Sequence, residues 1–141
     1  MIEYVDGIGV ADFIALHVAV GWAALKPEKA RRALENSAIV LSAVEGERVV
    51  GVVRVISDLC YLAHIEDVMV LPEYQGRGIG STLVDAVLQR LRGLIDEGGQ
   101  MLVCLISAPN KEGFYGRRGF VSHPNEVLGY GMTRLLKHGE G

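Results

Sequence analysis

Three glycines at alternate positions, Gly76, Gly78 and Gly80, separate a β-branched segment ending at Pro72 from a long amphipathic segment, residues 81–95. The apolar residues of the amphipathic segment fall on one helical face and its polar residues on the other, which predicts a helix. The N-terminus of a helix carries unpaired backbone N–H groups and a partial positive charge. Glycines directly before it let a bulky anion approach the backbone. The pattern therefore predicts a phosphate-binding loop that leads into a helix.

Three kinds of phosphate-binding loop compete for this pattern. A P-loop needs Lys followed by Ser or Thr after its last glycine, but here Ser81 follows the last glycine directly. A dinucleotide-binding loop needs a glycine at its sixth position, and counting from Gly76 or Gly78 gives Ser81 or Leu83. The third pattern, Q-G-x-G-x-G, begins at Gln75 and follows a strand that ends in V-x-P. The third pattern agrees with the sequence.

The remaining segments predict one α+β domain built around a mixed sheet. The length of 141 residues suits a single domain, residues 1–141, with an aliphatic core. Strands are expected at residues 1–5, 38–44, 48–56, 62–71, 101–107, around 120 and at 132–136, and helices at 12–20, from 27, at 81–95 and within 108–120. We expect Asp12 to be the N-cap of the first helix and Pro27 to begin the second.

The composition argues against several classes of function. No run approaches the ~20 apolar residues that span a membrane, and the N-terminus has no secretory signal pattern. A formal net charge of -3 argues against a general nucleic-acid binder. Cys60 and Cys104 lie in apolar runs, which predicts buried free thiols in a reducing cytoplasm. No pair of histidines has a metal-ligand spacing, so we expect no bound metal. The free thiols and the missing secretory signal lead us to expect a cytoplasmic protein.

Two stretches together indicate a family. The stretch from Val68 to Val84, "VMVLPEYQGRGIGSTLV", resembles the acetyl-coenzyme A-binding motif of the GNAT superfamily of N-acetyltransferases. The later stretch "NKEGFYGRRGF", residues 110–120, resembles the second signature of that family. Two signatures in the family's order are more specific than either alone. The resemblance implies a GNAT fold, with a largely antiparallel sheet and a central β-α-β cofactor-binding unit, and acetyl-coenzyme A as co-substrate.

The resemblance also implies which residues bind the cofactor. In the family, the strand before the loop pairs its backbone with the pantetheine arm, and the loop amides hold the pyrophosphate. The matching strand residues are Val68, Met69 and Val70, and the matching loop residues are Gln75, Gly76, Arg77, Gly78, Ile79, Gly80 and Ser81. Asn110 matches a position that touches the pantetheine, or it caps the short helix that follows. The side chain of Arg77 either adds a charge-assisted phosphate contact or is an ordinary solvated arginine.

Acyl transfer to an amine needs a base for the amine and an acid for the departing thiolate. The resemblance puts a tyrosine hydroxyl beside the sulfur, which makes Tyr115 the candidate acid. Adjacent strand residues point to opposite faces, so only one of Glu66 and Asp67 can face a given cleft. We place Glu66 first as the base, because it shares the side-chain direction of His64. Asp67, His64 and a water molecule remain alternatives, and either carboxylate could instead form a structural ion pair.

The resemblance implies an acceptor site formed by the N-terminal helices and the late loops. The aromatic residues and histidine in those segments are Phe13, His17, Trp22 and Tyr130. We expect a small-molecule primary amine as the acceptor and direct transfer through a ternary complex. A protein N-terminus or lysine is the second choice. Trp22 could equally belong to the core.

Two rival functions and one assembly remain open. A module that binds acyl-coenzyme A without catalysis would need neither Tyr115 nor a carboxylate beside the cleft. A toxin that acetylates aminoacyl-tRNA would need a basic face, and the chain offers only the short cluster "GRRGF". The segment "GMTRLL", residues 131–136, could form a strand that mediates a homodimer.

Overall fold

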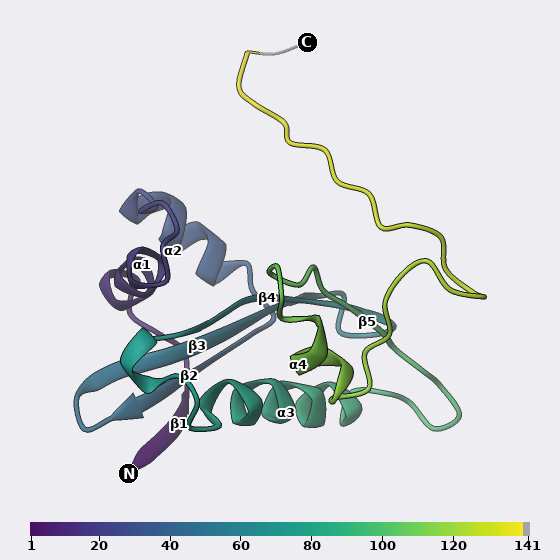
Figure 1. Ribbon diagram of the computed structural model, residues 1–141, viewed down its shortest axis with the longest axis horizontal. Coiled ribbons are helices and arrows are strands. Elements are labelled where there is room, and N and C mark those ends of the chain that lie inside the picture. Colours follow the sequence, from purple (N-terminus) through teal and green to yellow (C-terminus); the bar gives the residue numbers. More distant parts are fainter. Residues whose placement is uncertain (140–141) are drawn as a thin grey trace. The chain divides into compact units, whose positions relative to one another are not determined.

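A five-stranded sheet organises the larger part of the chain in the computed structural model, which describes residues 1–139 (Figure 1). The chain divides into two units, Met1–Ile106 and a second that begins at Ser107, and the first unit holds the whole sheet. The strands are β1 (Ile2–Asp6), β2 (Ile39–Glu45), β3 (Arg48–Ser57), β4 (Leu62–Val70) and β5 (Leu102–Cys104). They lie in this order across the sheet and are antiparallel, except for the parallel pair β4–β5.

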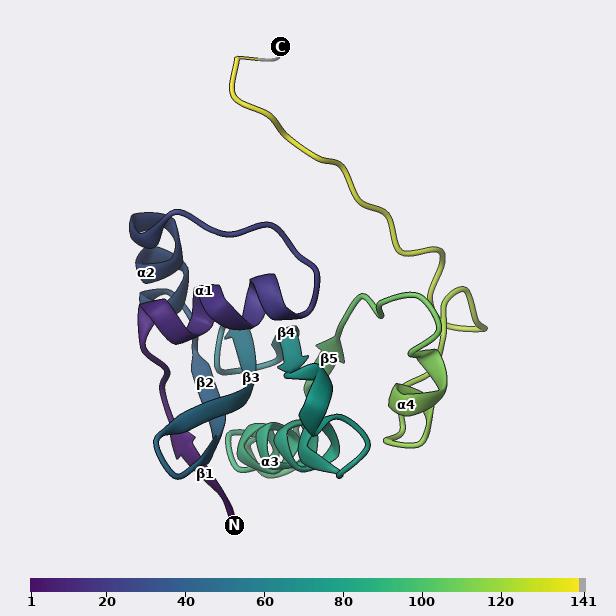
Figure 2. The same ribbon diagram turned by 60° about the vertical axis from the view of Figure 1, so that its left-hand side comes forward.

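Helices cover both faces of this sheet (Figure 2). On one face, α1 (Val10–Ala19) packs against α2 (Pro27–Glu35) and contacts β3 and β4. On the other face, α3 (Ile79–Arg92) contacts β2, β3 and β4. The chain runs from β4 through α3 to the parallel strand β5. The predicted α+β fold, with a largely antiparallel sheet and a central β-α-β unit, is therefore confirmed.

The core of the first unit is aliphatic, as the sequence predicts. In β3, the side chains of Val50, Val52, Val53 and Val55 are all 0% exposed, although successive residues of a strand point to opposite faces. This strand is therefore covered on both sides. The buried side chains of the covering helices include Phe13 and Leu16 from α1 and Leu83, Val84, Val87 and Leu91 from α3.

Three predicted helix boundaries are wrong by two or three residues. Gly9, not Asp12, is the N-cap of α1, and Asp12 lies in the first turn, where a carboxylate faces the positive end of the helix. The first helical residue of α3 is Ile79 because Gly78 before it has a left-handed φ of 80°, which a helix cannot continue. The last is Arg92, three residues before the predicted end. Helix α2 starts at its predicted proline.

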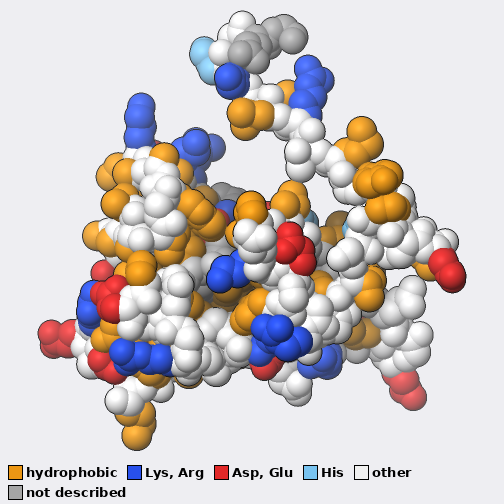
Figure 3. Space-filling view, viewed as in Figure 1, with side chains coloured by type: hydrophobic (Ala, Val, Ile, Leu, Met, Phe, Trp, Pro, Cys, Tyr) orange, Lys and Arg blue, Asp and Glu red, His pale blue; other side chains and the backbone are white. Residues whose placement is uncertain are grey.

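The strands predicted around residue 120 and at 132–136 are absent from the described residues. After α4 (Glu112–Gly116), the chain up to residue 139 contains neither helix nor strand, and β5 is shorter than the predicted 101–107. Burial of an apolar face normally offsets the entropy lost when a strand forms. Here the apolar side chains stay exposed (Figure 3). Those that are 72% to 92% exposed are Val121, Val127, Tyr130, Met132, Leu135 and Leu136. The homodimer contact stays a prediction.

The expectation that both cysteines are buried is wrong for Cys60, which lies in the turn between β3 and β4. Both cysteines are free, but Cys60 is exposed in this turn, whereas Cys104 is half-buried in β5. The carboxylate of Asp58 accepts hydrogen bonds from the backbone N–H groups of residues 60, 61 and 62, which draws Cys60 into the turn rather than the core. Within residues 1–139, no helix has both the length and the hydrophobicity to cross a membrane.

Gly51 of β3 sets the separation between the sheet and α3. A Cβ at this position would lie 3.1 Å from the backbone oxygen of Met69 and 3.3 Å from side-chain atoms of Ile79 and Leu83. We expect Gly51→Ala to lower the free energy of unfolding by about 1–3 kcal/mol, because the helix must shift to accommodate the methyl group. Gly129→Ala is the matched control, since its Cβ would meet no atom within 4 Å. Urea unfolding measures both, and equal stability of the two variants would contradict the expectation.

Candidate functional site

The edge of β4 that faces β5 is only partly paired. Parallel pairing ends at His64 and Cys104, and within residues 1–139 no strand continues it along the second half of β4. The opposite edge of β4 pairs with β3 as far as its last residue. An unpaired strand edge presents N–H and C=O groups that can pair with an extended ligand. The predicted pantetheine-binding residues, Val68, Met69 and Val70, lie in this unpaired half.

The glycine loop leaves open space in front of α3. The short helix η1 (Pro72–Tyr74) turns the chain after β4, and both Gly76 and Gly78 then adopt a φ of 80°. A Cβ added at either glycine would meet no atom within 4 Å. No side chain caps the N-terminus of α3, so its first backbone N–H groups point out without a capping partner. The predicted loop residues from Gln75 to Ser81 therefore form a turn into which an anion could fit.

Tyr74 holds this loop against the turn between β2 and β3. Its hydroxyl donates a hydrogen bond of 2.7 Å to Glu45, and this bond raises the pKa of the Tyr74 hydroxyl. The guanidinium groups of Arg48 and Arg77 lie 5.4 and 4.8 Å from the centre of the Tyr74 ring. Arg48 also pairs with Glu73 at 2.5 Å. The side chain of Arg77 thus packs along the loop, and its contact with a phosphate stays a prediction.

A β-bulge in β4 changes the direction of Asp67. Between the pairs Val52–Met69 and Arg54–Glu66, β4 contains one more residue than β3, and Asp67 has a φ of 51°. The prediction that Glu66 and Asp67 face opposite ways is therefore wrong, because the bulge interrupts the alternation. The register sets Glu66 opposite Arg54, and the carboxylate of Asp67 also lies 2.6 Å from Arg54 Nε. Both carboxylates lie on the face that carries Arg54.

The ion pair between Arg54 and Asp67 is largely buried on the side of the sheet that α1 covers. Its two side chains are 15% and 13% exposed, and Arg54 Nη1 lies 3.4 Å from the hydroxyl of Ser37. Both charges act on His17 of α1. Burial lowers the pKa of His17 from its usual 6.5, while Asp67 raises it and Arg54 lowers it further. The His17 ring is therefore neutral at pH 7.

His64 and Glu66 form a second acid–base pair on β4. Nδ1 of His64 lies 2.8 Å from a carboxylate oxygen of Glu66, which confirms the predicted common direction of the two side chains. The two side chains are 36% and 37% exposed, so water can reach the pair, but Nδ1 of His64 is itself buried and its contact with Glu66 lacks hydrogen-bond geometry. This geometry suits a base that passes its proton to solvent. The catalytic role of Glu66, or of His64 or Asp67 in its place, stays a prediction.

The second unit holds the other two predicted site residues. The ring of Tyr115 packs at 5.0 Å from the ring of Phe114 and 5.9 Å from that of Phe120. Burial raises the pKa of the Tyr115 hydroxyl, so it keeps its proton at neutral pH. Asn110 has a φ of 67°, but Lys111 is the N-cap of α4, so the capping alternative for Asn110 is wrong. The contacts of Tyr115 and Asn110 with a cofactor stay predictions.

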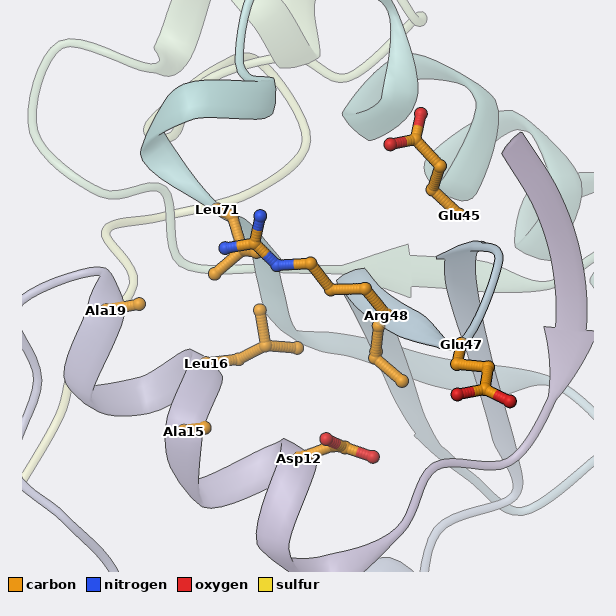
Figure 4. A pocket seen from close by; sticks show the side chains of 9 residues that line it. Asp12, Ala15, Leu16, Ala19, Glu45, Glu47, Arg48 and Leu71 are labelled. Atoms are coloured by element: carbon orange, nitrogen blue, oxygen red, sulfur yellow. The ribbon is translucent and has the colours of Figure 1, made fainter. Parts of the chain in front are cut away.

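A pocket of about 630 Å³ between α1 and the β2–β3 turn was not predicted from the sequence (Figure 4). Asp12 of α1 and Glu47 of the turn lie at its rim, and Leu16 and Leu71 are part of its apolar wall. None of the predicted site residues lines it. Its residues come from distant parts of the chain and share no motif, so only packing brings them together.

Residues 15–134 match the family model described as an acetyltransferase (GNAT) domain. The chain is 31% identical over 115 residues to an uncharacterized N-acetyltransferase of Pyropia yezoensis, covering 79% of this chain and 64% of the relative. It is 30% identical over 132 residues to the chloroplastic serotonin N-acetyltransferase 2 of Oryza sativa subsp. japonica, covering 91% of this chain and 64% of that protein. The chain thus spans slightly less than two thirds of these relatives' length.

A crystal structure of a protein of unknown function from methicillin-resistant Staphylococcus aureus, described as a probable acetyltransferase, has a similar fold. Its TM-score is 0.84 at 26% sequence identity, and the match covers 96% of this chain and all of that one. The family match covers most of the sequence, and it includes both stretches that carried the resemblance. This chain therefore belongs to the GNAT acetyltransferase domain family.

Proposed function

We propose that this protein is an N-acetyltransferase that moves an acetyl group from acetyl-coenzyme A to a primary amine by direct transfer in a ternary complex. One observation carries the proposal: the unpaired half of β4 leads directly into the glycine loop at the start of α3. A strand edge suits the amide-bearing pantetheine arm, and a helix N-terminus suits a diphosphate. Coenzyme A carries both groups in the same molecule.

The proposed cofactor site combines these two features. The backbone of Val68, Met69 and Val70 would pair with the pantetheine arm. The backbone amides from Gln75 to Ser81 would hold the diphosphate, with no metal taking part. The Gln75 side chain already donates a 2.9 Å hydrogen bond to the Val70 carbonyl, which ties the strand end to the loop.

The chemistry requires one proton to leave the amine and one to reach the departing sulfur. Glu66 is the proposed base, since its exposed pair with His64 can pass the proton to water. Tyr115 is the proposed acid, because partial burial raises the pKa of its hydroxyl, which keeps its proton at neutral pH. The Tyr115 hydroxyl is then in the protonation state that its role needs.

A small amine is the proposed acceptor, and a protein N-terminus or lysine is the alternative. The rice relative is named for serotonin, which is an aromatic primary amine. Trp22 follows α1 with 43% of its surface exposed, and its ring packs at 5.2 Å from that of His17. An exposed indole next to a second aromatic ring offers a surface for an aromatic or cationic amine.

Release of free coenzyme A tests the activity and separates the rival functions. Purified protein with acetyl-coenzyme A should release thiol when an amine is added, and the panel comprises serotonin, 2-phenylethylamine, spermidine and a lysine-containing peptide. Thiol release with the lysine-containing peptide but with none of the small amines would favour a protein acceptor. Calorimetric binding of acetyl-coenzyme A without release under any condition would favour a non-catalytic module. Folded protein that binds no coenzyme A species would refute the proposal.

Replacement of Gly78 tests the loop. We expect Gly78→Ala to weaken acetyl-coenzyme A binding about tenfold or more, because the added methyl group occupies the space in front of the α3 amides. The positive φ should also cost roughly 1–2 kcal/mol of stability. Gly46→Ala in the β2–β3 turn is the matched control, with a φ of 60° and open space around its Cβ. Calorimetry should find that the control binds acetyl-coenzyme A with normal affinity. Equal affinities of the two variants would rule out the loop as the diphosphate-binding site.

Replacement of Tyr115 tests the acid. Tyr115→Phe keeps the ring contacts with Phe114 and Phe120 but removes the hydroxyl proton. We expect the turnover number to fall roughly 100-fold while the dissociation constant of acetyl-coenzyme A stays within about twofold. Tyr61→Phe, on a side chain that is 68% exposed, should change neither value. Unchanged turnover of Tyr115→Phe across the pH range would remove this residue from the mechanism.

A further inference from the structure

The pocket between α1 and the β2–β3 turn has no role in the proposed transfer reaction. Its volume of about 630 Å³ lies within the range of roughly 300–1,000 Å³ that is usual for sites that bind small molecules. Neither Glu66, His64 nor Tyr115 lines the pocket, and no residue of the glycine loop lines it. All the residues that line it belong to the first unit. The pocket is therefore a candidate for a separate binding site.

One face of α1 and the residue after β4 give the pocket an apolar wall. Ala15, Leu16 and Ala19 line the pocket from α1, where residues three or four positions apart are neighbours. Leu16 and Leu71 are 1% and 8% exposed. Ala15 and Ala19 are exposed, and their short side chains leave the pocket open. An alkyl chain in the pocket would remove its own surface and part of this wall from water, which favours binding.

The charge of the pocket is mainly negative and lies toward one end. The charged residues that line the pocket are Asp12, Glu45, Glu47 and Arg48. The guanidinium of Arg48 is already paired with Glu73, at 2.5 Å. Figure 4 shows this guanidinium toward Leu71, whereas the carboxylates of Asp12 and Glu47 lie toward the other end of the pocket. That end attracts cations and repels anions.

The carboxylates of Asp12 and Glu47 have no partner within residues 1–139. Neither forms an ion pair or a side-chain hydrogen bond, whereas Glu45 accepts the hydrogen bond of Tyr74. Both residues are exposed, so their oxygens are free to exchange water for a cation. Among the described residues, no group of three or more His, Cys, Asp or Glu could hold a metal ion. The acidic end next to an apolar wall therefore matches an organic cation.

We propose that this pocket binds a primary alkylammonium ion, with the ammonium group beside Asp12 and Glu47 and the alkyl chain along Leu16 and Leu71. An ammonium group has three N–H donors, so it can bind both carboxylates at once. The carboxylates select the charge, and the apolar wall selects a ligand with an alkyl chain. Binding is non-covalent and needs no acetyl-coenzyme A. The site is therefore additional to the acceptor site of the proposed transferase and does not depend on it.

Methyl NMR of the unchanged chain without acetyl-coenzyme A tests the binding. Hexylammonium should shift the methyl resonances of Leu16 and Leu71 and leave those of Leu135, an exposed leucine of the second unit, unchanged. It should bind about fivefold or more tightly than ethylammonium, which has a shorter chain, and than hexan-1-ol, which has no charge. The proposal is overturned if hexylammonium shifts neither Leu16 nor Leu71, or if it binds no more tightly than either analogue.

Replacement of Ala15 tests the location of the site. Ala15→Leu should fill the pocket, and the fold should tolerate it because the position is exposed and leucine is a good helix former. We expect it to weaken hexylammonium binding about tenfold or more. Ala11→Leu is the matched control, since it makes the same change at an exposed position of α1 that does not line the pocket. Equal hexylammonium affinities of the two variants would overturn the proposal.

Activity separates this site from the acceptor site. With the most active amine of the panel, kcat/KM of Ala15→Leu should stay within about twofold of the unchanged protein, because no proposed transfer residue lines the pocket. A larger fall in the folded variant would make the pocket part of the acceptor site and would overturn the assignment of a second site. Hexylammonium binding is measured without acetyl-coenzyme A, so a failure of this proposal and a failure of the transferase proposal are distinguishable.

Discussion

The unequal pairing of β4 is the constraint on which the candidate site depends. One edge of the strand is hydrogen-bonded to β3 as far as Val70, but pairing with β5 stops at His64. In a continuous sheet both edges of a central strand would be satisfied, and no backbone would remain for a ligand. The chain leaves this edge unpaired where β4 turns into the glycine loop. Within residues 1–139, the edge of β4 without a strand partner and the uncapped amides of α3 therefore follow each other directly.

The open edge requires support from the rest of the unit. On one face, α3 packs closely on β3 because Gly51 has no side chain. At the helix start, Tyr74 connects the loop to the β2–β3 turn through its hydrogen bond to Glu45. A glycine-rich segment loses much conformational entropy when it is ordered. A fixed helix and an anchored η1 supply part of that order before a ligand binds.

The bulge at Asp67 gives the opposite face its chemical character. An extra residue in β4 brings Glu66 and Asp67 to the same side of the sheet, where regular alternation would have separated them. Arg54 pairs with Asp67 and lies opposite Glu66, so a cation balances two neighbouring carboxylates. Helix α1 then covers this face with Phe13 and His17. Packing removes the charges of Arg54 and Asp67 from water, and their ion pair compensates for this loss. A polar cluster can therefore lie next to the aliphatic core.

The sequence by itself determined the α+β order of elements, the aliphatic core, the position of the glycine loop before the long helix, and the family. Each of these follows from local features, such as apolar period, β-branched runs and the spacing of glycines, which act over a few neighbouring residues. It did not determine the direction of Asp67, the contacts of His17 or the absence of strands between residues 117 and 139. The bulge arises from the register between two strands, and the cluster at His17 arises where α1 meets β3 and β4. The C-terminal segments have strand-like composition, but a strand forms only where a neighbouring edge supplies hydrogen bonds and buries a face. Only the tertiary structure decides these features, because each depends on a partner that is distant in the chain.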